Sequence, residues 1–191
     1  MKRFLVIIIC ISLIYSAHSQ SLGLRANTEF TDNKEMNSAF GGGIYLDIND
    51  SFKRIDIIVS LDFINKEKDF PGMISSFHNL YYSVSPLYVF PAKEKMEIKI
   101  GPIFNYNTIN ANENYNPINI ISTYMSKYVG IGLIADIQFK EICKLPLNFD
   151  IFISPSYLIN IKYQSLNGNK SEYADNLQIF YLQVGLSYII Q

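Results

Sequence analysis

The stretch MEIKIGPIFNYN, residues 96–107, alternates between two kinds of side chain. Successive residues of a β-strand point to opposite faces, so this alternation predicts a strand with one apolar and one polar face. Glu97 and Lys99 lie on the polar face in the middle of the segment. The apolar face is formed by Met96, Ile98, Ile100, Pro102, Phe104 and Tyr106. The fold depends on which face points into the protein.

Seven other segments have the same period of two residues, and no convincing amphipathic helix separates them. The chain is therefore expected to be all-β, with eight strands. Each is long enough for the roughly 9 to 11 residues that a tilted membrane-spanning strand needs. The other seven strands are expected within residues 22–30, 40–49, 54–64, 79–90, 128–140, 147–162 and 178–190.

The connections between these strands alternate in length. Those after the second, fourth and sixth strands are short, whereas those after the third, fifth and seventh are longer and rich in Asn, Ser, Lys and Gly. Short turns at one end and long loops at the other are typical of an outer-membrane barrel with its turns in the periplasm. The two longest connections, residues 107–126 and 162–176, are expected to be loops and the best candidates for interaction surfaces.

Two kinds of eight-stranded barrel fit the pattern, and they orient the faces oppositely. A soluble lipocalin-like barrel turns its apolar side chains inward around a ligand, whereas a membrane barrel turns them toward lipid. Charged residues within the strands would cost up to roughly 2 to 4 kcal/mol each if they faced lipid near the midplane, so they must meet water or partner charges. The polar candidates for the lumen are Arg25, Glu29, Asp47, Arg54, Asp56, Asp62, Glu97, Lys99, Asp136, Lys140 and Asp150.

Aromatic residues on the apolar face decide between the two barrels. They fall into two bands with mostly aliphatic residues between them, which matches two membrane interfaces and has no reason to occur in a ligand cavity. An up-and-down transmembrane β-barrel with apolar residues facing lipid is therefore predicted. The outer girdle is expected to hold Phe30, Phe40, Phe63, Phe104, Tyr106 and Phe180, and the inner girdle Tyr88, Phe90, Phe139, Phe149 and Tyr188.

The first 19 residues have the pattern of a secretory signal peptide. Lys2 and Arg3 precede an apolar core, and Ala17 and Ser19 are small residues at the positions that a signal peptidase inspects. The barrel domain is then expected to span residues 20–191. Removal of Lys2 and Arg3 reduces the basic residues from 16 to 14 against 17 acidic ones, a formal net charge of −3, so no nucleic-acid partner is expected.

Further along the chain, no run of apolar residues is long enough for a membrane-spanning helix, so a membrane protein would have to cross with strands. The predicted location is the bacterial outer membrane. The expected partners are its lipid, the barrel-assembly machinery during insertion and other envelope or secretion proteins.

Few residues are candidates for catalysis or metal binding. His78 is the sole histidine after residue 19, and Cys143 has no cysteine partner there, so neither a metal site nor a cofactor is expected. Some eight-stranded barrels are lipid-modifying enzymes with a His and a Ser at the outer rim, and Ser76 and His78 share a face there. Asp69 or Asp62 would have to orient the histidine. The protein is nonetheless expected to have no enzymatic activity.

The charges of the polar face have mixed signs. Cations at Arg25, Arg54, Lys99, Lys140 and Lys162 alternate with the acidic residues, and in so narrow a barrel they are expected to form internal ion pairs that close it. A small channel remains an alternative. Pro86, Pro102 and Pro155 each lack a backbone donor, so a bulge or a local break in strand pairing is expected near them.

The segment LYYSVSPLYVF, with its central proline, is followed by MEIKIGPIFNY with its Gly-Pro, and YVGIGLIADIQF supplies a Gly-x-Gly strand. These motifs resemble the PorT-like outer-membrane β-barrel family of Bacteroidota. The resemblance covers roughly residues 21–191. It implies the barrel fold and adds a part in protein secretion to the possible roles. The sequence thus favours a non-enzymatic envelope protein of structural, assembly, secretion or loop-mediated interaction function; a small channel and an exported lipocalin-like binder are the alternatives.

Overall fold

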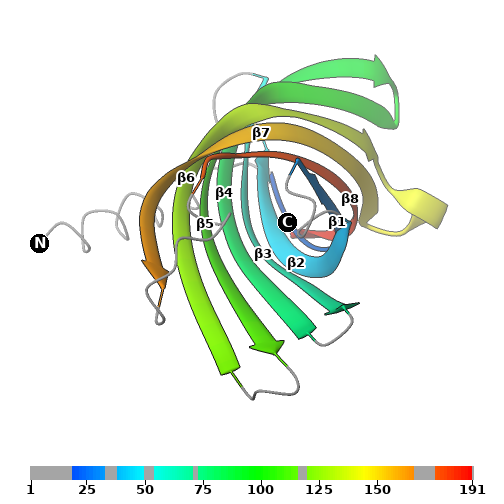
Figure 1. The fold of residues 1–191 in the computed structure, drawn as a ribbon. Helices are drawn as coiled ribbons and strands as arrows, with labels where there is room; N and C mark the ends of the chain where they lie inside the picture. Colours follow the sequence, from blue (N-terminus) through cyan, green and yellow to red (C-terminus); the bar gives the residue numbers. More distant parts are fainter. Residues whose placement is uncertain are drawn as a thin grey trace, which may run out of the picture.

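Eight antiparallel strands close into one barrel, in which each strand pairs with its neighbours in sequence and β8 pairs with β1 (Figure 1). The computed structural model describes residues 19–32, 38–49, 54–70, 73–115, 120–165 and 175–190. The predicted fold class is confirmed, whereas residues 1–18 of the predicted signal peptide lie outside the described part. The elements are β1 (Ser19–Thr31), β2 (Ala39–Asn49), β3 (Ile55–Phe70), β4 (Met73–Lys93), β5 (Met96–Tyr115), β6 (Ile120–Phe139), a 3₁₀ turn (Ile142–Lys144), β7 (Leu147–Ser165) and β8 (Leu177–Ile190).

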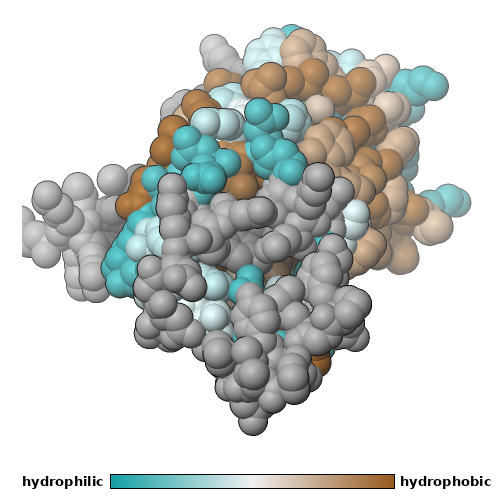
Figure 2. Space-filling view, viewed as in Figure 1, coloured by the Kyte–Doolittle hydropathy of each residue, from teal (hydrophilic) through white to brown (hydrophobic). Residues whose placement is uncertain are grey.

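The two faces of the strands have opposite chemistry. Along β8, buried and exposed residues alternate almost without interruption, and all of the exposed ones except Gln178 are apolar. Leu24 and Leu133 on the outer surface are 69% and 62% exposed, while Lys99 and Asp47 are fully buried inside. Hydrophobic surface covers much of the flank of the barrel (Figure 2). A barrel with apolar residues outside and charges inside suits lipid rather than water, so the lipocalin-like alternative is excluded.

No helix in the described part of the chain has the length and apolar character needed to cross a membrane.

The strands are longer than predicted on one side of the barrel. β5 continues to Tyr115 and β6 begins at Ile120, so most of the loop expected at residues 107–126 is a paired hairpin. β7 likewise continues to Ser165. Figure 1 shows the ends of β3 to β6 extending well past those of β1, β2 and β8. The polar composition misled the prediction, because cross-strand hydrogen bonds satisfy the backbone outside the membrane as well as within it.

Two breaks in pairing occur, and between them they include all three prolines, as predicted. The β4–β5 ladder has no partners between the pairs Val84–Phe104 and Tyr88–Ile100, and Pro86 lies in this gap opposite Gly101 and Pro102. The β6–β7 ladder has an equivalent gap beside Pro155. At both gaps the proline carbonyl approaches a glycine, Gly101 or Gly132, so closely that a Cβ there would overlap the oxygen.

Candidate functional site in the barrel interior

An arginine and an aspartate form the central ion pair of the interior. The Arg25 Nε donates to Asp62 Oδ1 at 2.8 Å, and its Nη2 makes a second, parallel bond to Oδ2. Ser60 and Asn27 complete the cluster, with Asn27 Nδ2 donating to Asp62 Oδ1 at 2.6 Å. The guanidinium also lies over the ring of Phe152, 5.3 Å from its centroid. A bidentate pair of this kind is both strong and geometrically fixed.

A lysine holds a second cluster nearer the end of the barrel where β1 begins. The Lys99 ammonium lies 2.6 Å from an Asp47 oxygen and 2.7 Å from an Asp56 oxygen, and all three side chains are buried. Gln138 Nε2 donates to Asp47 at 3.3 Å and to Asp150 at 2.8 Å. Strands β2, β3, β5, β6 and β7 are thus connected across the lumen by polar side chains.

Asp150 accepts hydrogen bonds from several sides. The Tyr45 hydroxyl and the Ser187 hydroxyl both donate to its Oδ2, the latter at 3.2 Å. Gly185 makes room for the tyrosine, because a Cβ there would lie 2.8 Å from the Tyr45 hydroxyl oxygen. The Tyr45 ring meets Phe152 edge to face, with 5.2 Å between centroids.

Asp136 is the exception in this network. It is fully buried, and neither of its carboxylate oxygens has a hydrogen-bond partner among the described residues. It lies opposite Lys99 in the β5–β6 ladder, yet the ammonium contacts Asp47 and Asp56 instead. An unpaired carboxylate in a low-dielectric interior is costly.

We expect Asp136→Asn to raise the free energy of unfolding by about 1 kcal/mol, because an amide of the same size carries no uncompensated charge. Reversible urea unfolding in detergent micelles measures this change. Asp150→Asn is the matched control, and it should lower stability because Asp150 accepts three side-chain hydrogen bonds. Equal losses from the two substitutions would contradict the assignment of Asp136 as unpaired.

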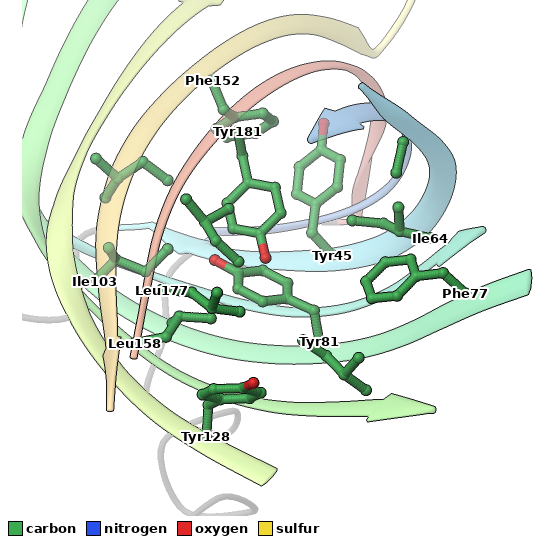
Figure 3. Packing of buried hydrophobic residues seen from close by; sticks show 14 of the residues in the cluster. Tyr45, Ile64, Phe77, Tyr81, Ile103, Tyr128, Phe152, Leu158, Leu177 and Tyr181 are labelled. Atoms are coloured by element: carbon green, nitrogen blue, oxygen red, sulfur yellow. The ribbon is translucent and has the colours of Figure 1, made fainter. Parts of the chain in front are cut away.

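Two tyrosines fill the middle of the lumen. The rings of Tyr81 and Tyr181 are 4.7 Å apart between centroids, and both side chains are fully buried. They extend from opposite walls toward one another (Figure 3). Beside them, Asn79 Nδ2 donates to Glu29 Oε2 at 2.9 Å, and the Tyr181 hydroxyl donates to Asn107 Oδ1 at 3.3 Å. Aromatic side chains and hydrogen bonds therefore occupy the centre of the barrel.

Three of the residues predicted for the lumen lie at its mouth. Arg54 precedes β3, is exposed and has a left-handed backbone with φ of 72°, so the prediction that it faces the interior from a strand is wrong. Its position in the turn, rather than in the alternating ladder, is the reason. Lys140 follows the end of β6, and its ammonium pairs with Glu97 at 2.6 Å. Together with Asp56 these residues line a pocket of about 180 Å³ at this end.

The structure buries the other predicted lumen residues inside the barrel. They are Arg25, Glu29, Asp47, Asp56, Asp62, Lys99, Asp136 and Asp150.

Every residue predicted for the aromatic girdles points away from the interior. Phe40 and Tyr188 are the most exposed of them, at 65% and 56%. Several are in contact, with Phe30 6.2 Å from Phe180 and Phe139 6.2 Å from Phe149 between ring centroids. The remaining members are Phe63, Tyr88, Phe90, Phe104 and Tyr106.

The possible histidine site has no acid bound to His78 among the described side chains. His78 lies on the outer face of β4, where its Nδ1 is 2.5 Å from Asn65 Oδ1 and its ring stacks on Phe63. Asp62 faces the opposite way and is bound to Arg25, so it cannot orient the histidine. The side chain of Asp69 lies outside the described part. No group of three or more acidic, histidine or cysteine side chains suited to a metal ion occurs among the described residues.

The tyrosines of the interior were missed as functional candidates. Tyr45, Tyr81 and Tyr181 fall on the polar face by their alternation, whereas the predicted lumen residues are all charged and the predicted aromatic residues all lie on the apolar face. The relevant signal was available. A tyrosine on the inward face of a narrow barrel is long enough to cross it and carries a hydroxyl that needs a partner.

Comparison with solved structures finds barrels of the same size. A major outer membrane protein from Thermus thermophilus aligns with a TM-score of 0.63 and 14% identity over 91% of this chain and all of that one. OprG from Pseudomonas aeruginosa aligns with a TM-score of 0.58 and 8% identity over 92% and 97% of the two chains. Neisserial surface protein A aligns with a TM-score of 0.52 and 11% identity over 89% of this chain and 95% of that one. These identities establish likeness of fold alone.

No protein-family model matches the chain, and neither does any curated protein. The location follows from the fold together with the surface. A closed barrel whose apolar side chains face outward needs lipid around it, and barrels of this kind span outer membranes. The protein is an integral β-barrel of the bacterial outer membrane.

Proposed function

We propose that the protein is a closed, non-enzymatic barrel that serves an interaction, assembly or structural role in the cell envelope through its outer end. The observation that carries the proposal is the extension of β3 to β7 beyond the outer aromatic residues, which include Phe63 and Tyr106. This part has its own packed interior, in which Phe77, Ile109 and Tyr124 are buried. Stable strands of this length outside the membrane make a rigid surface on which a partner can bind.

Orientation follows from the ends of the strands. The two-residue turn Glu94–Lys95 and the compact turn around Ile142–Lys144 lie at the end where β1 begins, and short turns belong in the periplasm. The extended sheet then projects from the cell. Its outward face carries polar residues such as Ser76, Asn110 and Asn112.

Photo-crosslinking in intact cells tests this proposal. A photoreactive residue at Asn112, on the projecting hairpin, should form a discrete crosslink to an envelope protein. The same residue at Lys144, in the periplasmic turn, should not give that product. An identical pattern at both positions, or no product at Asn112, would count against the outer end as the interaction surface.

The filled interior supports a closed barrel over a small channel. We expect no conductance above background from the wild-type protein in planar bilayers, since Tyr81 and Tyr181 meet in the lumen and ion pairs lie beside and below them. The double substitution Tyr81→Ala and Tyr181→Ala should produce discrete openings. Tyr82→Ala is the matched control, because Tyr82 is 44% exposed on the outer surface and should leave the barrel closed. Conductance by the wild type would favour the channel.

Membership of the PorT-like family, and with it a part in protein secretion, is the finer form of this proposal. It is supported by the proline strand at Pro86, the Gly-Pro at Gly101 and the Gly-x-Gly at Gly130 to Gly132. Loss of specific extracellular proteins from cells lacking this chain, restored by the wild-type gene, would support it. Whether or not the protein is PorT-like, its expected partners are outer-membrane lipid and the barrel-assembly machinery.

A further inference from the structure

Two lysines face each other on the outside of the barrel. Lys127 on β6 and Lys162 on β7 are direct cross-strand partners. Lys127 points outward because its neighbours Ser126 and Tyr128 are buried inside, and Lys162 is exposed. The sequence alternation predicted Lys162 as an interior charge, which is wrong because the ladder shifts register beside Lys127. The shift leaves two successive residues, Ile161 and Lys162, on the outer surface.

This arrangement is unfavourable without an anion. Like charges on directly opposed residues of a sheet destabilise it. Within the described residues, neither Lys127 nor Lys162 forms an ion pair or a side-chain hydrogen bond, in contrast to Lys95, Lys99 and Lys140. A negative group between the two ammonium ions would remove their repulsion and bind with both charges.

The lysines lie at the level of lipid headgroups. In the ladder, Thr108, Lys127 and Lys162 form one row, and the next row toward the periplasm contains Tyr106, Val129 and Ile159. Tyr106 belongs to the outer aromatic residues, which mark the interface of such barrels. The two ammonium ions therefore meet the outer leaflet where its polar groups begin.

An apolar groove lies on the membrane side of the lysine pair. It has a volume of about 630 Å³ and runs over the outer surface of β6, β7, β8 and β1. Ile131 and Tyr157, which line it, are 55% and 44% exposed and lie on the same two strands as the lysines. The outward-facing lining also includes Phe30, Leu133, Pro155 and Phe180, with the polar Asp32 and Gln178 at the outer ends of β1 and β8. A groove of this composition suits a hydrocarbon chain.

We propose that Lys127 and Lys162 bind the phosphate of an anionic lipid in the outer leaflet, and that one acyl chain of this lipid occupies the groove. The lysine pair matches the charged headgroup of a lipid, and the apolar groove matches an acyl chain. Their order along the barrel, with the lysines outside and the groove toward the membrane interior, is that of headgroup and chain in the outer leaflet. Basic residues at a membrane surface attract anionic lipid, and each contributes about fivefold in affinity.

Lipid binding to the purified barrel in a neutral detergent tests this site. Native mass spectrometry should show phosphatidylglycerol bound about 25-fold more tightly than phosphatidylcholine with the same chains, because the two lysines contribute about fivefold each. The double variant K127Q/K162Q should lose this preference. The control K93Q/K144Q removes two exposed lysines from the periplasmic side and should retain it. I131W, which places a large ring over the groove, should weaken both lipids while the preference for phosphatidylglycerol persists.

Three outcomes would overturn the proposal. The first is equal binding of the two lipids by the wild type, and the second is an unchanged preference in K127Q/K162Q. The third is full competition by inorganic phosphate at the same concentration as the lipid, which would mean that the acyl chain adds nothing and that the groove is not part of the site.

Discussion

Lys99→Met should lower the free energy of unfolding by about 3 to 5 kcal/mol, the largest loss we expect from a single side chain of the interior. The ammonium is the shared counter-ion of Asp47 and Asp56, and all three side chains are buried, with Asp56 the most exposed of them at 3%. Methionine fills a similar volume but leaves two carboxylates buried without a positive charge. Urea unfolding in micelles, monitored by the heat-modifiable shift in gel mobility, measures the loss.

Two further variants make the result specific. Lys95→Met removes an ion pair with Glu141 in which both side chains are 57% exposed, so it should change stability by less than about 1 kcal/mol. Neutralising the whole cluster, with Asp47→Asn and Asp56→Asn added to Lys99→Met, should recover most of the loss, because a buried set of charges contributes little once all of it is removed. If Lys99→Met costs no more than Lys95→Met, water reaches the cluster and the lumen is not closed there.

Gly132→Ala should cost about 3 kcal/mol, because the new methyl group would overlap the carbonyl oxygen of Pro155. Neither strand can move away easily, since Pro155 is paired with Phe180 on its other side. Gly101→Ala should behave alike, because the Pro86 carbonyl approaches it in the same way. The fraction of folded, heat-modifiable barrel after refolding and the urea midpoint are the measurements.

Gly42→Ala is the control for both glycines. The nearest atom to a Cβ at Gly42 is the Arg25 carbonyl oxygen at 3.2 Å, a contact that a small shift relieves. We expect a change below about 1 kcal/mol. Losses of the same size at Gly42 and Gly132 would mean that any alanine weakens these strands, and that the proline breaks do not impose a special requirement.

The sequence was sufficient to predict the eight strands and the direction of their faces because both depend on a period of two, which is local. In MEIKIGPIFNYN, Lys99 and Ile100 are adjacent, and the structure places one inside at zero exposure and the other outside at 46%. The proline breaks were also predictable, since a missing backbone donor is a property of the residue itself.

The alternation of the side chains did not predict where a strand ends or where its register shifts. Arg54 was placed inside because the period was extended one residue beyond the strand, and Lys162 because a register shift lies between it and Leu158. The ion-pair partners of the buried charges could not be predicted from the sequence either. Lys99 is opposite Asp136 in the ladder but binds Asp47 and Asp56 from β2 and β3, across the lumen. Such contacts depend on the curvature of the whole barrel.

The pairing of β1 with β8 has a consequence for the order of folding. Among the described ladders, it alone joins strands that are not consecutive in the chain, pairing Gln20 with Ile190. Every other ladder forms by a short-range hairpin, whereas this one must bring together residues at opposite ends of the barrel sequence, which is entropically slow. We therefore expect the curled sheet to form first and the closure of the β1–β8 seam to be the last and slowest event.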